Sequence, residues 1–323
     1  MTRVRIAQLG VAQPHAAGYR ETLRLMPEVD LVAGFDLNLD AARQALQSLD
    51  SELSLYGDIG ALLEAETPEA VLICLPAANT PAAITLAARA GCHVYAEKPC
   101  ARTADEFRPA AEAVALAGVQ FATGYLRHFS PAALTIKEIV AAGWLGRLTS
   151  AEARIVTSSV SRRDPTHWLF QREAAGGGIM HWLGCHLLDL LRWTTGSEAD
   201  VVSAIMGTLS GAAIDVEDTV ALAVQYRNGM IASLHCAYAT DRGDQLYFAL
   251  RGTLGWVSWD DCGPEVRVRS THPAWQTAPT RHYRFEPDAV GGIGGAMGLC
   301  AIEQFIASFQ DGAPPAFSTD DTL

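Results

Sequence analysis

The chain of 323 residues is poor in positive charge: 24 lysines and arginines stand against 36 aspartates and glutamates, giving a formal net charge of −12. Sequence-independent binding of nucleic acids needs clustered basic side chains on phosphates, so this balance argues against that class and favours a small-molecule partner. No apolar run approaches the roughly 18 residues that span a bilayer, and we expect no membrane partner. The composition predicts a soluble globular protein.

Cysteine is also scarce. The seven cysteines are an odd number, and they lack the close pairs that are typical of metal sites. The first residues run directly into a strand-like segment, without the charged and apolar leader of secreted proteins. We therefore expect reduced thiols, a cytoplasmic location and no bound metal.

Up to about residue 125, short apolar runs alternate with longer helical patterns, which is the signature of βαβ units on a parallel sheet. The fourth helical pattern is preceded by Thr103, with Glu106 three residues later, a capping-box spacing. The expected strands are 4–9, 31–35, 70–75, 93–96 and 119–123, and the expected helices lie near 16–27, 39–48, 80–90 and 103–117.

Beyond residue 148 the pattern changes from alternating units to adjacent strands. Asn228-Gly229 predicts a hairpin with a primed turn, because both residues tolerate positive φ. Successive hairpins predict a mostly antiparallel sheet. The expected elements are a helix over 179–193, strands at 219–226, 230–238, 246–250 and 256–259, and a last helix over 296–309.

The fold class expected from these patterns is α/β followed by α+β. Residues 1–125 form a domain with a doubly wound parallel sheet. Residues 126–323 form a second domain, for substrate binding and oligomerisation, with a large, mostly antiparallel open-faced sheet. The last helix, about 296–311, is a candidate to pack back near the first domain.

The turn after the first expected strand is the first candidate binding site. Gly10 ends the strand, and Ala12, Gln13, Pro14 and His15 lead into a helix whose N–H groups can bind a pyrophosphate. The loop departs from G-x-G-x-x-G, because Ala12 replaces a glycine and Pro14 removes one donor. An ordinary strand-to-helix turn remains the alternative to a dinucleotide site.

Asp36 follows the second expected strand, where a carboxylate can accept hydrogen bonds from both ribose hydroxyls of a dinucleotide. It would repel the 2′-phosphate of NADP, and no lysine or arginine lies between it and Arg43 to receive that phosphate. The sequence therefore favours a Rossmann domain that binds NAD, with NADP less favoured. A helix-capping role for Asp36 stays open.

The segment from Ala90 to Pro99 reads AGCHVYAEKP and is the most specific in the chain. It resembles the Gfo/Idh/MocA family of oxidoreductases, whose members carry an alanine-glycine-x-histidine-valine strand that ends in Glu-Lys-Pro. The resemblance continues through the glycine run 176–178, through 216–219 and through 252–255, and so covers most of the chain.

The resemblance implies roles for individual residues. Lys98 would be catalytic, stabilising charge on a substrate oxygen, with an exposed Glu97–Lys98 pair as the alternative. His186 would be the acid/base, since the ordinary pKa of histidine, about 6.5, suits proton exchange; a core histidine is the alternative. The implied cofactor contacts are Gly10, Ala12, Gln13, Pro14, His15, Asp36, Leu75, Pro76, Asn79, Glu97 and Lys98.

At two positions the chain departs from the family pattern. Many relatives have an aspartate where Trp182 stands, and Trp182 would offer an apolar or stacking wall to a sugar ring. Thr80 stands where relatives often have histidine. Asp189 would either orient His186 or serve packing, and the loop 162–164 is either solvated or in contact with substrate. The expected substrate contacts are Lys98, Arg127, His167, Trp168, Trp182, His186 and Asp189.

Together these implications describe an NAD(P)-dependent dehydrogenase or reductase that acts on CH–OH groups. It would transfer a hydride between nicotinamide and a secondary hydroxyl or carbonyl of a sugar, cyclitol or related polyol. Two alternatives stay open: an NAD-recycling lyase or glycosidase of the same family, and a non-catalytic dinucleotide-binding regulator. The resemblance also implies a homo-oligomer, a dimer or tetramer, and a carboxyl-terminal segment that usually continues past the position of Leu323.

Overall fold

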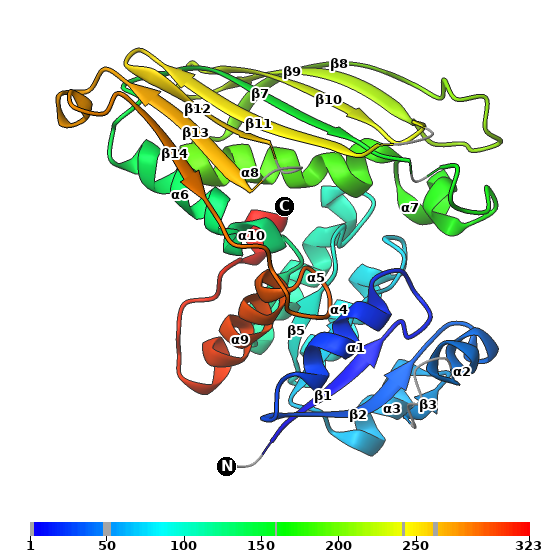
Figure 1. The fold of residues 1–323 in the computed structure, drawn as a ribbon. Coiled ribbons are helices and arrows are strands. Elements are labelled where there is room, and N and C mark those ends of the chain that lie inside the picture. Colours follow the sequence, from blue (N-terminus) through cyan, green and yellow to red (C-terminus); the bar gives the residue numbers. More distant parts are fainter. Residues whose placement is uncertain (1–2, 48–52, 159, 241–242, 261–263) are drawn as a thin grey trace. The chain divides into compact units, whose positions relative to one another are not determined.

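The computed structural model describes residues 3–47, 53–158, 160–240, 243–260 and 264–323, which form two compact units (Figure 1). The first unit comprises Met1–Leu126 together with Asp288–Leu323, and the second comprises Arg127–Pro287. The last helix is thus part of the first unit. Within the described ranges, every helix is too short or too polar to cross a membrane.

The first unit is built on a six-stranded parallel sheet with the strand order β3-β2-β1-β4-β5-β6. The order reverses between β1 and β4, and in sheets of this kind ligands bind outside the carboxyl ends of the strands at that point. The strands are β1 (Val4–Leu9), β2 (Val29–Phe35), β3 (Ser54–Tyr56), β4 (Ala70–Ile73), β5 (His93–Ala96) and β6 (Phe121–Thr123).

Helices cover both faces of this sheet. On one face, α3 (Ile59–Glu66), α4 (Thr80–Arg89) and α5 (Ala104–Ala117) bury apolar side chains against the strands. On the other, Tyr19 of α1 and Phe305 of α9 each contact Tyr95 of β5, at ring-centroid distances of 5.6 Å. The bounds of these two helices are α1 (Ala16–Arg24) and α9 (Ala296–Gln310), and this unit also contains α2 (Leu39–Gln47) and α10 (Thr319–Thr322).

The second unit is built on an eight-stranded sheet with the order β14-β13-β12-β11-β7-β10-β9-β8. Its neighbouring strands are antiparallel except for the parallel pair β7 and β10, so the predicted mostly antiparallel sheet is confirmed. The strands are β7 (Leu148–Val156), β8 (Ala199–Gly207), β9 (Thr219–Tyr226), β10 (Ile231–Ala237), β11 (Gln245–Gly252), β12 (Gly255–Asp260), β13 (Glu265–Ser270) and β14 (Thr280–Arg284).

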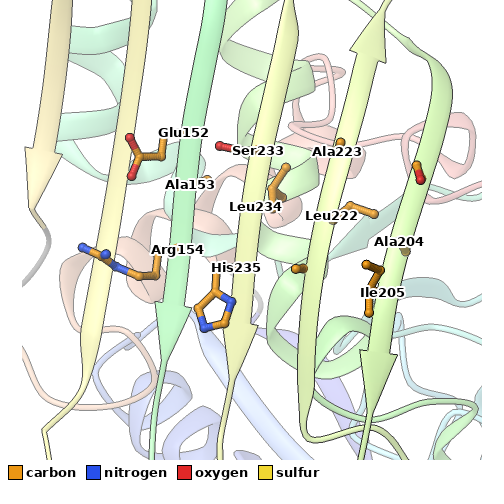
Figure 2. Close-up of a pocket in the computed structure, with 12 residues that line it drawn as sticks. Glu152, Ala153, Arg154, Ala204, Ile205, Leu222, Ala223, Ser233, Leu234 and His235 are labelled. Carbon is orange, nitrogen blue, oxygen red and sulfur yellow. The ribbon is translucent and has the colours of Figure 1, made fainter.

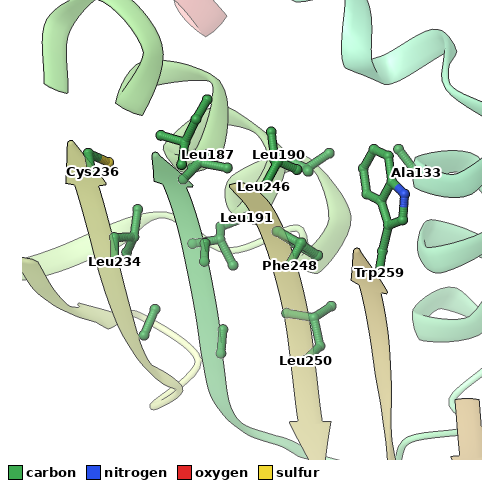
Figure 3. Packing of buried hydrophobic residues seen from close by; sticks show 14 of the residues in the cluster. Ala133, Leu187, Leu190, Leu191, Leu234, Cys236, Leu246, Phe248, Leu250 and Trp259 are labelled. Atoms are coloured by element: carbon green, nitrogen blue, oxygen red, sulfur yellow. The ribbon is translucent and has the colours of Figure 1, made fainter. Parts of the chain in front are cut away.

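One face of this sheet is covered and the other is open. Side chains alternate along β10, so that Ser233 and His235 lie on the open face (Figure 2) while Leu234 points into the core. Leu187 and Leu191 of α8 pack on that covered face (Figure 3). The helical segments that lie wholly in this unit are α6 (Pro131–Ala141), η2 (Trp168–Phe170), α7 (Arg172–Ala175), η3 (Met180–Gly184), α8 (Cys185–Thr195) and η4 (Pro273–Trp275), and η1 (Leu126–Phe129) begins at the last residue of the first unit's N-terminal segment.

The hairpin between β9 and β10 forms where it is predicted, but its turn is not of the primed type. Among the described residues only His15 and Thr67 combine a side chain with positive φ, so Asn228 does not adopt it and only Gly229 does, at 84°. The N–H of Tyr226 donates to the carbonyl of Met230 at 2.9 Å, which closes a three-residue loop with glycine in the left-handed region.

Candidate functional site

The turn between β1 and α1 needs glycine at its first position. Gly10 has φ of 97°, and a Cβ there would lie 2.3 Å from the carbonyl oxygen of Cys74. Ala12, Gln13 and Pro14 follow, and the Gln13 carbonyl accepts from the N–H of Ala16 at 3.1 Å. In the first turn of α1, the N–H groups of residues 17 and 18 have no acceptor in the described part of the chain. Such a helix start is suited to an anion.

Asp36 ties this turn to the end of β2. Its carboxylate is buried, and its two oxygens accept from the N–H groups of Ala12, at 2.8 Å, and of Asn38, at 3.0 Å. The side chain that caps α2 is that of Asn38, which accepts from the N–H groups of Asp40 and Ala41 at 3.1 Å each. Asp36 therefore shapes the turn, and its two oxygens keep lone pairs beyond these two hydrogen bonds.

Glu97 and Lys98 follow β5 and form a buried charged pair rather than an exposed one. The side chain of Lys98 is 2% exposed and that of Glu97 is 11% exposed, with Nζ of Lys98 3.8 Å from Oε1 of Glu97. Nδ1 of His15 lies 3.3 Å from the same oxygen, and the Tyr19 hydroxyl donates to Oε2. Glu97 thus joins the end of β5 to the start of α1.

The charge state of Glu97 follows from these contacts. Burial acts to raise the pKa of its carboxyl, but the hydrogen bond from His15 and the charge of Lys98 outweigh burial, and the pKa is lowered from its ordinary value. Gly124 permits this arrangement, because a Cβ there would lie 2.6 Å from Oε2 of Glu97. Glu97 is therefore an anion that fixes the position of the Lys98 ammonium.

The loop after β4 holds the other expected cofactor contacts. The Asn79 N–H donates to the carbonyl of Pro76 at 2.8 Å, and the buried Thr80 hydroxyl donates to the carbonyls of Leu75 and Pro76 at 3.1 Å each. Where relatives often have histidine, this chain thus has a hydroxyl that turns back onto its own loop.

Tyr19 and Arg20 are site residues that sequence reasoning missed. Arg20 is buried on α1, and its Nη1 donates to Oε1 of Gln8 and to the carbonyl of Val11, both at 2.8 Å. Burial lowers the pKa of its guanidinium. Arg20 could have been found from the sequence, because it stands at a core-facing position of a mostly apolar helix face. No sequence pattern pairs Tyr19 with Glu97.

In the second unit, His186 is carried by α8, which follows the π-helical turn η3. Oε1 of Glu217 accepts from the N–H of Gly178 at 2.8 Å and from that of Met180 at 3.3 Å. A Cβ on Gly178 would lie 1.8 Å from the Glu217 carbonyl oxygen. Glu217 therefore anchors the start of the segment that carries Trp182 and His186. Sequence reasoning missed this role, although Glu217 lies in the stretch 216–219 that supports the family resemblance.

Two contacts between polar and aromatic side chains involve expected substrate residues. Cζ of Arg163 lies 4.8 Å from the ring centroid of Trp182, which is buried. Burial lowers the pKa of the His167 imidazole, and the charge of Arg163 lowers it further. The Trp168 ring is 5.6 Å from that of His167. The structure thus places Trp182 against Arg163, and Trp168 against His167.

Asp189 and Arg127, two further expected substrate residues, each have a partner of their own. Oδ2 of Asp189 lies 2.7 Å from Nε2 of His128, and the His128 ring stacks on Trp193 at 4.2 Å. Cζ of Arg127 lies 5.9 Å from the Trp259 ring centroid. His186 itself is half-buried. The structure gives Asp189 a histidine partner that the sequence did not suggest, and an orienting role toward His186 stays a prediction.

A parallel sheet with a glycine turn after its first strand and a carboxylate after β2 is typical of a dinucleotide-binding domain. Comparison with family models agrees: residues 4–125 match the oxidoreductase family with an NAD-binding Rossmann fold, and residues 133–258 match the GFO/IDH/MocA C-terminal domain. The chain belongs to the Gfo/Idh/MocA family of NAD(P)-binding oxidoreductases.

Curated relatives are distant. The chain is 28% identical over 264 residues to the rhizopine catabolism protein MocA of Rhizobium meliloti, a match covering 80% of this chain and 78% of that protein. It is 25% identical over 314 residues to the myo-inositol 2-dehydrogenase of Thermotoga maritima, covering 94% and 87%. A 28% identical match to the levoglucosan dehydrogenase of Pseudarthrobacter phenanthrenivorans covers only about half of either protein, 52% and 49%.

Solved structures share the fold over the whole chain. The crystal structure of GenD2 from gentamicin A biosynthesis, in complex with NAD, superposes with a TM-score of 0.82 at 25% identity, covering 100% of this chain and 90% of that one. Levoglucosan dehydrogenase in complex with NADH and levoglucosan gives a TM-score of 0.85 at 21% identity, covering 99% and 93%, a likeness that shows the fold.

Proposed function

We propose that this protein is an NAD-dependent dehydrogenase that transfers a hydride between nicotinamide and a secondary hydroxyl or carbonyl of a sugar, cyclitol or related polyol. The observation that carries the proposal is the buried Lys98, which Glu97 holds at the carboxyl end of β5. The names of the relatives, which include an inositol dehydrogenase and a levoglucosan dehydrogenase, support the substrate class.

The residues around the β1–α1 turn fit a dinucleotide. The first-turn N–H groups of α1 are suitable donors for a pyrophosphate, and the Asp36 carboxylate is a suitable acceptor for ribose hydroxyls. A 2′-phosphate would meet the charge of Asp36, so NAD is preferred to NADP. The rest of the turn, the loop at residues 75–79 and Glu97 complete the proposed contacts. When bound, the nicotinamide accepts or supplies the hydride.

Lys98 and His186 carry the proposed polar chemistry. The Lys98 ammonium donates a hydrogen bond to the reacting oxygen and stabilises negative charge that develops there. Glu97 offsets the cost of burying that ammonium. The His186 imidazole takes the hydroxyl proton during oxidation and returns it during reduction. Arg127, His167, Trp168, Trp182 and Asp189 are the proposed substrate contacts beside these two.

A panel of cyclitols, hexoses, anhydro sugars and sugar acids, each incubated with the protein and NAD, tests this function. We expect NADH to accumulate with at least one member, and NADPH to accumulate more slowly when NADP replaces NAD. Failure of every member to reduce NAD, or turnover in which NAD stays bound and no net NADH forms, would contradict the proposed dehydrogenase.

We also propose that copies of this chain associate, as a dimer or tetramer, through the open face of the eight-stranded sheet. Apolar side chains lie uncovered on its edge strand β8, where Ile205 is 81% exposed. A hollow of about 500 Å³ on this face is lined by Glu152 and Arg154 of β7 and by His235 of β10 (Figure 2). Because both charge signs lie on one face, a two-fold-related copy can pair opposite charges across this interface.

Sedimentation equilibrium of the parent and of Ile205→Glu tests this association. The parent should sediment as a dimer or tetramer and the variant as smaller species, because a buried unpaired carboxylate disfavours an interface. The exposed Leu116 on α5, changed to Glu, is the matched control in the first unit and should leave the mass unchanged. A monomeric parent would contradict the proposal.

A further inference from the structure

Arg163 is a half-buried cation with no anionic partner among the described residues. Its guanidinium lies over the Trp182 ring, 4.8 Å from the centroid, and no described carboxylate comes within ion-pair distance. The adjacent Asp164 is turned to its own loop, where its Oδ1 accepts from the N–H and the hydroxyl of Thr166, both at 2.8 Å. Burial, and then the charge of Arg162, lower the pKa of Arg163. A cation in such a place costs free energy unless something compensates it.

The contact with Trp182 leaves the hydrogen-bonding capacity of this cation in place. A guanidinium has five N–H donors in a planar fork, and an aromatic ring offers them no acceptor oxygen. That fork matches the two oxygens of a carboxylate or of a phosphate. Arginine on Trp182 is thus prepared for an anion, not for an isolated hydroxyl.

The position of Trp182 connects this cation with the proposed chemistry. Trp182 lies in η3, one turn before His186, and Glu217 anchors the start of η3 through two N–H groups. Turns of π-helix inside α-helices occur frequently at functional sites. His167, a second proposed substrate contact, feels the charge of Arg163 as well. Arg163 therefore contacts a residue to which the proposed function assigns substrate binding.

We propose that Arg163, held on the Trp182 ring, binds an anionic group of the substrate, so that this protein acts on a carboxylate- or phosphate-bearing sugar or polyol. The inference rests on the proposed function and narrows its substrate class. The neutral part of such a substrate would present its secondary hydroxyl to His186, and the anionic group would set its orientation.

The test uses three probes that differ in one group: D-glucose, D-glucuronate and D-glucose 6-phosphate, each titrated by calorimetry into the full chain saturated with NAD. We expect at least one anionic probe to bind roughly tenfold to a hundredfold more tightly than glucose, the range for hydrogen bonds to charged groups. Arg163→Gln should remove that preference, and Arg163→Lys should keep part of it. A preference for glucuronate would identify a carboxylate, and one for the phosphate ester a phosphate.

Arg162→Gln is the matched control, because Arg162 is the exposed neighbour with the same charge; it should keep most of the preference. Equal or tighter binding of glucose to the parent, or equal weakening of all three probes by Arg163→Gln, would overturn the inference and leave the dehydrogenase proposal intact. Weaker NAD binding by Arg163→Gln would also overturn the inference, because Arg163 would then bind the cofactor rather than the substrate. If NAD binds but none of the probes does, the proposed sugar-binding function fails together with this inference.

Discussion

One charged side chain of the second unit differs from the buried charges of the first unit in how it is compensated. In the first unit, Glu97 lies between Lys98, His15 and Tyr19, and both oxygens of Asp36 accept N–H groups, so each buried carboxylate is compensated by the chain itself. In the second unit, the Arg163 guanidinium lies on an aromatic ring without a described acid beside it. Charge that the chain compensates fixes geometry, whereas charge that the chain leaves uncompensated is available to recognise a ligand.

The largest effect should come from Lys98, the charge that the first unit positions most completely. Lys98→Met removes the proposed donor to the reacting oxygen and should lower kcat by roughly 10²–10⁴-fold. NAD binding, measured separately by calorimetry, should change far less. Steady-state rates with a polyol identified by the panel provide the measurement, and a rate equal to that of the parent would remove Lys98 from the mechanism.

His186 tests whether the second unit supplies the proton acceptor. His186→Gln keeps a polar side chain of similar size but cannot exchange a proton, so we expect kcat to fall by roughly 10²–10⁴-fold. The pH dependence of kcat that belongs to this group should disappear as well. A pH–rate profile of the variant that matches the parent in height and shape would refute the assignment.

The unfolding free energy of Glu97→Gln tests how far the first unit depends on its compensated charges. Glu97→Gln leaves the Lys98 ammonium buried without its partner and should cost about 3–5 kcal/mol of unfolding free energy at neutral pH. The folded pKa of Glu97 is lowered, so its contribution is present above the ordinary value of 4.5 and is lost as pH falls through the folded pKa. The difference between parent and variant in urea unfolding should therefore shrink on acidification.

Glu106→Gln is the matched control for that measurement. Glu106 pairs with Arg102 at a one-third exposed position, and solvent screens such pairs, so the cost should be at most about 1 kcal/mol. Equal losses for the two variants would mean that the Glu97 cluster has no special role in the first unit.

Glu217 should give the smallest of these effects. Glu217→Ala leaves the N–H groups of Gly178 and Met180 without their acceptor and should destabilise the protein by about 1–3 kcal/mol. Turnover should fall because η3 positions Trp182 and His186. Urea unfolding and steady-state kinetics measure the two effects, with the exposed Glu112→Ala as control. Unchanged turnover would show that the anchor does not position His186.

Much of the first unit was predictable because its signals are local. Apolar runs that alternate with helical periods gave five of its strands, and the predicted Thr103 cap forms, with its side chain accepting from the Glu106 N–H. The segments β3 and α3 escaped detection because a three-residue strand shows too little periodicity. In the second unit, β7 was missed because polar residues interrupt its apolar pattern. The strand β8 was missed because its side chains are exposed and pack on no core.

The candidate site was predictable only in part. Lys98 and Asp36 follow strands within a short motif, so sequence spacing placed them. Other contacts join residues that are tens of positions apart in the sequence. Tyr19 contacts Glu97, Glu217 contacts the start of η3, and His128 contacts Asp189. Such pairs depend on how the chain folds back on itself, and no local pattern encodes them.

The central claim is that this chain binds NAD through the turn that Asp36 shapes, and separate calorimetric titrations of NAD and NADP into cofactor-stripped protein test it most directly. We predict tight binding of NAD and weaker binding of NADP, with the difference reduced in Asp36→Ser. Binding of neither dinucleotide would contradict the account, because the variant glycine turn would then not serve a cofactor.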